Sequence, residues 1–140
     1  MAECKIGVVG VGKMGEYHVG VLSDIHEAEL VGVVDSDQKR AKIISERYKT
    51  SNYKDYKELF KKVDAVVVSV PTSMHYSIAK EFIAAGIHTL LEKPCTNDLG
   101  QAEELFELAA KKNITLHIGH VERFNGAVQE LFKIVKDPIY

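Results

Sequence analysis

Short apolar runs rich in valine and isoleucine alternate along this chain with longer stretches in which apolar residues recur at helical spacing. The runs predict buried strands, because a strand covered on both faces of a parallel sheet is apolar at successive positions. The predicted strands are residues 5–9, 30–34, 51–53, 65–70, 88–92 and 115–120. The predicted helices or helical turns are residues 17–22, 36–48, 55–62, 77–85, 99–112 and 127–136. This alternation predicts the α/β class: a doubly wound parallel sheet (Rossmann fold) of about six strands, with helices on both faces.

A glycine-rich turn, Gly10-Val11-Gly12-Lys13-Met14-Gly15, joins the first predicted strand to the first helix. In a G-x-G-x-x-G turn the first glycine permits the tight turn and the second lets the backbone approach a pyrophosphate. The third glycine lets the helix pack close to the strand. The N–H groups at the positive end of the helix dipole would bind the pyrophosphate. We therefore expect a dinucleotide site that includes Lys13 and Met14; the alternative is a turn with a purely structural role.

An acidic residue, Asp35, ends the second predicted strand, twenty positions after the last glycine of the turn. A carboxylate at this place accepts hydrogen bonds from the adenosine ribose hydroxyls and repels a 2′-phosphate, so NAD is favoured over NADP. The basic residues Lys39 and Arg40 follow closely and weaken this preference, because either one could reach a phosphate.

The composition is that of an ordinary soluble domain. The 140 residues are 46% hydrophobic and carry a formal net charge of −2, which gives no basic excess for nucleic acid binding. No apolar stretch is long enough to span a membrane. The two cysteines form no disulfide framework, and the first strand starts too early for a signal peptide, so we expect a cytoplasmic protein.

Polar segments follow three of the predicted strands, at residues 69–75, 92–96 and 119–125. Ligands of doubly wound sheets bind outside the carboxyl ends of the strands. We therefore expect the three segments to converge on one crevice.

These motifs resemble the Gfo/Idh/MocA family of oxidoreductases, above all in Glu92-Lys93-Pro94 and in Val70-Pro71-Thr72 followed by His75. Residues 119–125 are similar to members that oxidise nucleotide sugars, such as UDP-N-acetylglucosamine 3-dehydrogenases, although Gly126 stands where similar sequences often have proline. The resemblance implies hydride transfer between a sugar hydroxyl carbon and NAD. The cofactor contacts that it implies beyond the turn and Asp35 are Ser69, Pro71, Thr72, His75, Glu92 and Lys93.

Lys93 is the residue expected to carry the chemistry. A lysine acts as a base only as the neutral amine, which burial beside a cationic nicotinamide ring would favour. The resemblance implies that Lys93 withdraws the hydroxyl proton, that Glu92 orients it or contacts the nicotinamide ribose, and that Pro94 stiffens the loop, with a cis bond as one option. The alternative is a solvated Glu92–Lys93 charge pair at a strand end.

Other polar residues are expected on the substrate side or in structural roles. The resemblance places His120 in the crevice, with Arg123 and Asn125 beside it; Arg123 binds an anionic substrate group or pairs with a neighbouring glutamate. His75 faces the nicotinamide or, alternatively, solvent. His117 and His120 lie three apart on a predicted strand and point to opposite faces, so no metal site is expected. The residues assigned to surface or packing positions are His18, His26, His88 and Cys95.

The resemblance covers the N-terminal half of the family's architecture. Residues 1–136 are expected to form the dinucleotide-binding domain and residues 137–140 the start of a substrate domain. The apolar stripe of the last helix, Val128, Leu131, Phe132 and Val135, either packs on the sheet or stays exposed and favours self-association. We expect residues 1–140 to bind NAD without turning over substrate, and the full-length form to be a homo-oligomer.

Two functional hypotheses follow from the sequence. The first is an NAD-dependent dehydrogenase acting on a small-molecule sugar or nucleotide sugar. The second is a stand-alone NAD(H)-sensing module, which needs the glycine turn and Asp35 but has no use for Glu92-Lys93-Pro94 or residues 120–125. These two segments favour the dehydrogenase.

Overall fold

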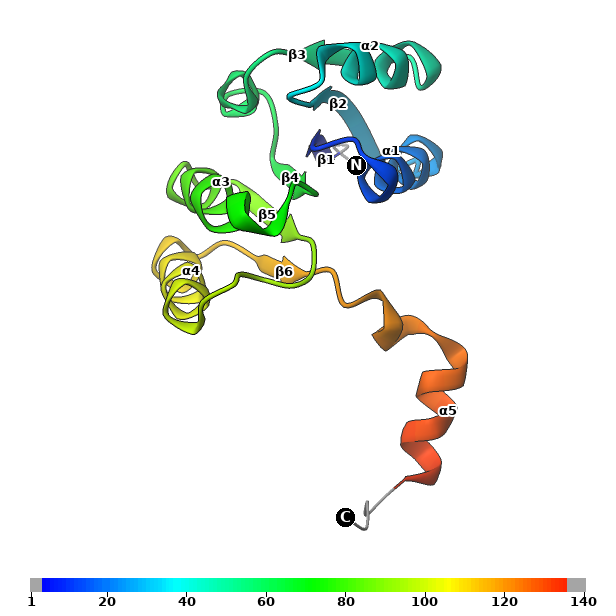
Figure 1. The fold of residues 1–140 in the computed structure, drawn as a ribbon, viewed down its shortest axis with the longest axis vertical. Helices are drawn as coiled ribbons and strands as arrows, with labels where there is room; N and C mark the ends of the chain where they lie inside the picture. The colour runs from blue at the N-terminus through cyan, green and yellow to red at the C-terminus, as the bar shows by residue number, and fades with distance from the viewer. Residues whose placement is uncertain (1–3, 136–140) are drawn as a thin grey trace.

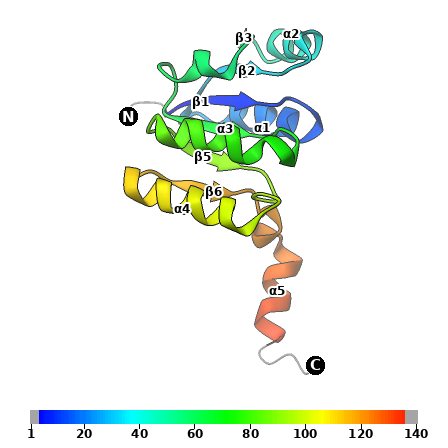
Figure 2. The same ribbon diagram turned by 60° about the vertical axis from the view of Figure 1, so that its left-hand side comes forward.

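The computed structural model describes residues 4–135 and contains a six-stranded parallel sheet with helices on both faces (Figures 1 and 2). The strands are β1 (Cys4–Val9), β2 (Ala28–Val34), β3 (Ser51–Tyr53), β4 (Ala65–Val68), β5 (His88–Leu91) and β6 (Leu116–Ile118). Their order is β3-β2-β1-β4-β5-β6, so the chain reverses direction across the sheet between β1 and β4. The predicted doubly wound α/β fold is confirmed, and the crossing from β1 to β4 creates the crevice in which such folds bind ligands.

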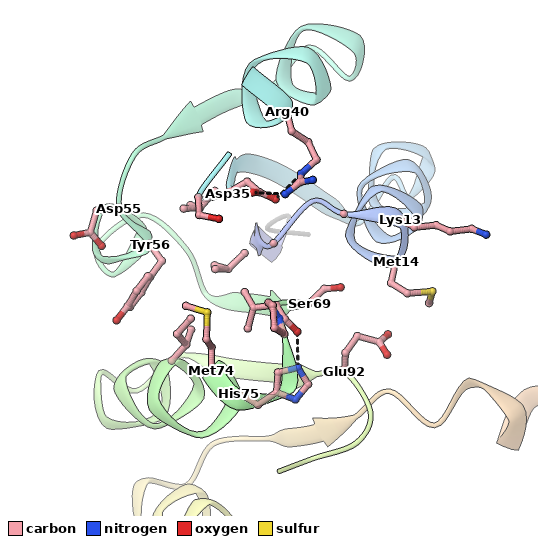
Figure 3. A pocket seen from close by; sticks show the side chains of 18 of the residues that line it. Lys13, Met14, Asp35, Arg40, Asp55, Tyr56, Ser69, Met74, His75 and Glu92 are labelled. Carbon is pink, nitrogen blue, oxygen red and sulfur yellow. Dashed lines mark hydrogen bonds and ion pairs between the residues drawn. The ribbon is translucent and has the colours of Figure 1, made fainter. Parts of the chain in front are cut away.

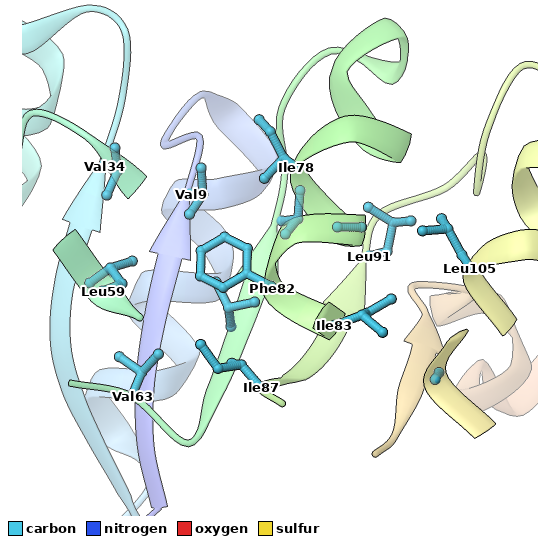
Figure 4. Close-up of a cluster of buried hydrophobic side chains, with 14 residues drawn as sticks. Val9, Val34, Leu59, Val63, Ile78, Phe82, Ile83, Ile87, Leu91 and Leu105 are labelled. Atoms are coloured by element: carbon cyan, nitrogen blue, oxygen red, sulfur yellow. The ribbon is translucent and has the colours of Figure 1, made fainter. Parts of the chain in front are cut away.

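The helices divide the core between the two faces of the sheet. They are α1 (Lys13–Asp24), α2 (Gln38–Arg47), α3 (Thr72–Ala84), α4 (Leu99–Lys112) and α5 (Gly126–Ile134), with 3-10 helices η1 (Tyr56–Leu59) and η2 (Val121–Phe124). Successive strand residues point to opposite faces, so Val8 packs with α1 and α2 whereas Val9 packs with α3 and α4. The larger cluster, centred on Phe82 of α3, is drawn in Figure 4.

Local sequence signals explain where most helices begin. Asp37 accepts hydrogen bonds from two backbone N–H groups at the start of α2, and Asp98 does the same for one N–H of α4. The third helix differs from the prediction, because α3 begins at Thr72, directly after Pro71, rather than at residue 77. Proline is compatible with this place, since its fixed φ suits a helix start and its missing N–H has no partner there.

The C-terminal part also differs from the prediction. Strand β6 is shorter than residues 115–120, so His120 lies beyond it and begins η2. Helix α5 lies away from the sheet (Figures 1 and 2) and has no buried residue, so of the two alternatives for its apolar stripe, packing on the sheet is contradicted and the exposed arrangement is found. The side chains of Leu131 and Phe132 are exposed. The predicted domain start at residues 137–140 lies outside the described residues.

None of the helices between residues 4 and 135 combines the length and the apolar character needed to cross a membrane.

Candidate functional site

A cavity of about 710 Å³ opens at the carboxyl edge of the sheet, where β1 and β4 lie side by side. Residues from five segments of the chain line it, and Figure 3 draws most of their side chains. The predicted cofactor residues that line it are Gly10, Gly12, Lys13, Met14, Asp35, Ser69, Pro71, His75, Glu92 and Lys93. Two of the expected residues, Gly15 and Thr72, are not part of this wall. The cavity therefore joins four of the predicted features: the glycine turn, Asp35, the segment after β4 and the segment after β5.

The glycines of the turn differ in what surrounds them. Gly10 has a φ of +84°, and a Cβ there would lie 2.4 Å from the carbonyl oxygen of Ser69. A Cβ on Gly15 would lie 1.8 Å from the carbonyl oxygen of Gly10, so this glycine lets α1 pack against the turn. A Cβ on Gly12 would meet no atom within 4 Å. Gly12 thus leaves an open space at the N-terminus of α1, of the kind a pyrophosphate occupies.

Asp35 forms one end of the cavity and is buried. Its Oδ2 accepts hydrogen bonds from the Val11 N–H at 2.8 Å and from Arg40 Nε at 3.1 Å. Its Oδ1 accepts from the Asp37 N–H at 2.8 Å and from Arg40 Nη2 at 2.9 Å. Burial raises the pKa of this carboxyl, but the hydrogen bonds from Arg40, Asp37 and Val11 outweigh it and hold the pKa below its usual value.

Residues that the sequence analysis did not single out line the same end. Lys54, Asp55 and Tyr56 follow β3 and line the cavity, and Figure 3 shows Asp55 and Tyr56 on the segment next to Asp35. The sequence at this point forms a capping box. The Asp55 side chain accepts a hydrogen bond from the Lys57 N–H, and the Glu58 side chain accepts one from the Asp55 N–H. This pattern predicts a helical start after β3 but says nothing about the ligand.

Glu92 and Lys93 form the opposite end of the cavity. Glu92 is 5% exposed, and its Oε2 accepts a hydrogen bond from the Lys93 N–H at 3.1 Å. Its Oε1 lies 2.7 Å from Nε2 of His18, a specific polar contact beyond the surface or packing role predicted for this histidine. Lys93 is exposed, so the described residues alone do not provide the burial expected for it. The Lys93–Pro94 peptide bond is cis, which the sequence analysis had left as one option.

His75 links the segment after β4 to the one after β5. Its side chain is 1% exposed, which contradicts the alternative of a solvent-facing residue. Nδ1 lies 2.8 Å from the carbonyl oxygen of Pro94, and Nε2 lies 2.9 Å from that of Val70 (Figure 3). His75 thus lines the cavity and holds its two loops together.

The substrate-side candidates His120, Arg123 and Asn125 are exposed and do not line the cavity. Asn125 caps α5 by accepting a hydrogen bond from the Ala127 N–H at 2.9 Å, and it donates to Glu122 at 2.8 Å. Arg123 forms no ion pair with Glu122 among residues 4–135.

Metal and thiol chemistry find no support at the site. No group of three His, Cys, Asp or Glu side chains that could hold a metal ion occurs between residues 4 and 135. Cys95 is half-buried, and burial raises the pKa of its thiol, the opposite of what activates a catalytic cysteine.

Comparison with known proteins gives a consistent family assignment. Residues 4–120 match a family model whose description is "oxidoreductase family, NAD-binding Rossmann fold". The chain is 34% identical to UDP-N-acetylglucosamine 3-dehydrogenase of Acidithiobacillus ferrooxidans over 131 residues, which are 94% of this chain and 41% of that protein. A solved structure of that enzyme matches with a TM-score of 0.89, over 96% of this chain and 44% of the other.

Two further solved structures contain nicotinamide cofactors. GenD2 from gentamicin A biosynthesis, in complex with NAD, is 28% identical with a TM-score of 0.93, over 98% of this chain and 40% of that one. KijD10, a 3-ketoreductase from Actinomadura kijaniata in complex with NADP and TDP-benzene, is 26% identical with a TM-score of 0.88, over 95% and 42%. This chain therefore spans less than half the length of each relative.

Proposed function

This chain belongs to the Gfo/Idh/MocA family of NAD-binding oxidoreductases, and we propose that it is the cofactor-binding part of an NAD-dependent dehydrogenase. The proposed reaction moves a hydride between nicotinamide and the hydroxyl-bearing carbon of a sugar or nucleotide sugar. Relatives with such names, including UDP-N-acetylglucosamine 3-dehydrogenase and myo-inositol 2-dehydrogenase, support this substrate class. A cytoplasmic location and a homo-oligomeric full-length protein remain predictions.

The observation that carries the proposal is the single cavity that runs from Asp35, past the glycine turn, to Glu92 and Lys93. A dinucleotide is an extended ligand with a diphosphate in its middle. The N-terminus of α1 would hold the diphosphate above Gly12, and Asp35 would accept hydrogen bonds from the adenosine ribose. This order leaves the nicotinamide half to the ends of β4 and β5, beside Ser69, Pro71, Glu92 and Lys93.

The residues of this chain then have separate tasks in the reaction. Bound NAD supplies the hydride acceptor. Lys93, at the end of the cavity expected to hold the nicotinamide, removes the hydroxyl proton of the substrate as the neutral amine. Glu92 accepts a hydrogen bond from the Lys93 N–H and so fixes the backbone from which the lysine side chain extends. His75 anchors the same loop through Pro94.

The choice between NAD and NADP depends on Asp35 and Arg40. The buried carboxylate disfavours a 2′-phosphate, whereas Arg40 is 47% exposed and could turn toward one. Two backbone N–H groups hold Asp35 whatever Arg40 does. We therefore propose NAD as the cofactor, with NADP as the weaker ligand.

Calorimetric titration of the 140-residue chain with NADH and with NADPH tests the cofactor part of the proposal. We expect NADH to bind at least about tenfold more tightly, since one unfavourable charge contact of about 1.4 kcal/mol has that effect. An Asp35→Asn variant should lose this preference, whereas Lys39→Gln, a change at an exposed position outside the cavity, should retain it. Tighter binding of NADPH by the wild type would show that Arg40 dominates, and binding of neither cofactor would contradict the proposal.

A further inference from the structure

The loop that carries Lys93 is held by histidines from two different helices. His75 of α3 contacts the carbonyl oxygen of Pro94 at 2.8 Å. His18 of α1 contacts the Glu92 carboxylate through Nε2 at 2.7 Å. The second contact joins residues 74 positions apart, and it links α1, which begins at the glycine turn, to the opposite end of the cavity.

The Glu92 carboxylate has little freedom to adopt another position. It is 5% exposed, and a Cβ on Gly119 would lie 3.0 Å from its Oε1, so the carboxylate lies directly against this part of the backbone. Its hydrogen-bond donors within residues 4–135 are the Lys93 N–H on Oε2 and His18 on Oε1. An ionised carboxylate only accepts hydrogen bonds, so Nε2 of His18 is the nitrogen that carries the proton.

Loss of the His18 donor would leave one oxygen of a buried carboxylate without a partner. A buried charge without a partner is strongly unfavourable, so the Glu92 carboxylate would turn toward water. This movement weakens its hydrogen bond with the Lys93 N–H. The effect is expected at the Lys93 end of the cavity, because within residues 4–135 no hydrogen bond joins Glu92 to Asp35 or to the glycine turn.

We propose that His18 is a positioning residue, which orients Glu92 and, through it, the Lys93 backbone at the nicotinamide end of the site. The inference rests on the proposed function, because it assumes that this end of the cavity holds the nicotinamide. His18 itself does not line the cavity and acts through Glu92.

Titration of the 140-residue chain with NADH and with ADP separates this role from general stabilisation. ADP contains the adenosine and diphosphate groups but has no nicotinamide half. We expect His18→Leu to weaken NADH binding about tenfold and to leave ADP binding within about twofold of the wild type. His18→Gln should restore most of the NADH affinity, since its amide nitrogen can donate to Glu92. His26→Leu is the matched control, because His26 is exposed on the loop after α1.

Each outcome decides the proposal. Equal losses of NADH and ADP affinity in His18→Leu would indicate a structural role, and no loss of either would show that Glu92 does not need His18; both overturn the proposal. If the wild type binds no NADH, the proposed function fails and the positioning role fails with it. If His18→Leu does not fold, His18→Asn takes its place, because its polar side chain is too short to reach Glu92, and the same NADH-to-ADP comparison applies.

Discussion

Both oxygens of Asp35 already accept hydrogen bonds, from two backbone N–H groups and from the Arg40 side chain. A ribose hydroxyl can bind here only by sharing or replacing one of these donors. The backbone donors cannot leave without unfolding the turn, whereas the side chain of Arg40 is 47% exposed and free to move. Cofactor binding should therefore displace Arg40 from the carboxylate. The free energy of this exchange contributes to the affinity of the site for the adenosine half of the cofactor.

At the level of single residues, the role of Lys93 distinguishes the dehydrogenase from the sensing module. In a form of the protein with the full length of its relatives, we expect Lys93→Met to lower turnover of UDP-N-acetylglucosamine with NAD at least about 100-fold, the usual contribution of a positioned base. NADH affinity should change little. Steady-state kinetics and calorimetry measure the two effects.

Lys39→Met is the matched control, because Lys39 is exposed on α2 and does not line the cavity. Turnover that survives in Lys93→Met would contradict the role of Lys93 as the base. A wild type that binds NADH but turns over no sugar or nucleotide sugar would instead support the sensing module.

At the scale of elements, the turn between β1 and α1 has separate parts for folding and for binding. A Cβ at residue 15 would overlap the Gly10 carbonyl, whereas a Cβ at residue 12 meets open space. We expect Gly15→Ala to lower the free energy of unfolding by about 3 kcal/mol or more, since α1 must move away from the turn. Gly12→Ala should leave stability within about 0.5 kcal/mol but weaken NADH binding at least about tenfold, because its methyl group fills the proposed diphosphate site.

Urea unfolding and NADH titration of the two variants test this division. The two glycines lie on the same turn, so each variant serves as the control for the other. Normal NADH binding by Gly12→Ala would contradict the proposed position of the diphosphate. Normal stability of Gly15→Ala would show that α1 can shift without loss of packing.

At the scale of the whole molecule, stability comes from the two clusters on either side of the sheet, and α5 stands apart from both. Phe82 is fully buried, and its ring lies edge-to-face with that of Phe60 at 5.0 Å between centroids. We expect Phe82→Ala to destabilise the chain by about 3–5 kcal/mol. Phe132→Ala in α5, at a side chain that is 75% exposed, should change stability by less than about 0.5 kcal/mol.

Chemical denaturation of both alanine variants, at low protein concentration and then at increasing concentrations, provides the comparison. A loss of more than about 1 kcal/mol in Phe132→Ala would show that α5 packs on the domain in solution. A loss that grows with protein concentration would instead support the self-association expected for its apolar stripe.

Much of the fold and part of the site could be predicted from local patterns. The β-branched runs identified the strands, and the glycine turn and Asp35, which their spacing assigned to one predicted site, line the same cavity. The start of α3 was missed because the apolar spacing over its first turn is weak, although buried His75 anchors that turn. The packing of α5 was left open between the sheet and an exposed position, because an amphipathic stripe indicates that a helix has a partner but does not identify it.

Local sequence patterns are enough to predict the order of strands and helices, the glycine turn and the polar residues that follow the strands. These features depend on neighbours along the chain, and their physical causes act over a few residues. Three features follow from the three-dimensional arrangement alone: His18 contacts Glu92, Tyr56 lines the same cavity as Asp35, and residues 120–125 lie outside that cavity. Such contacts depend on how strands distant in sequence are ordered in the sheet, and the hydrophobic pattern of one segment carries no information about which distant side chain it will touch.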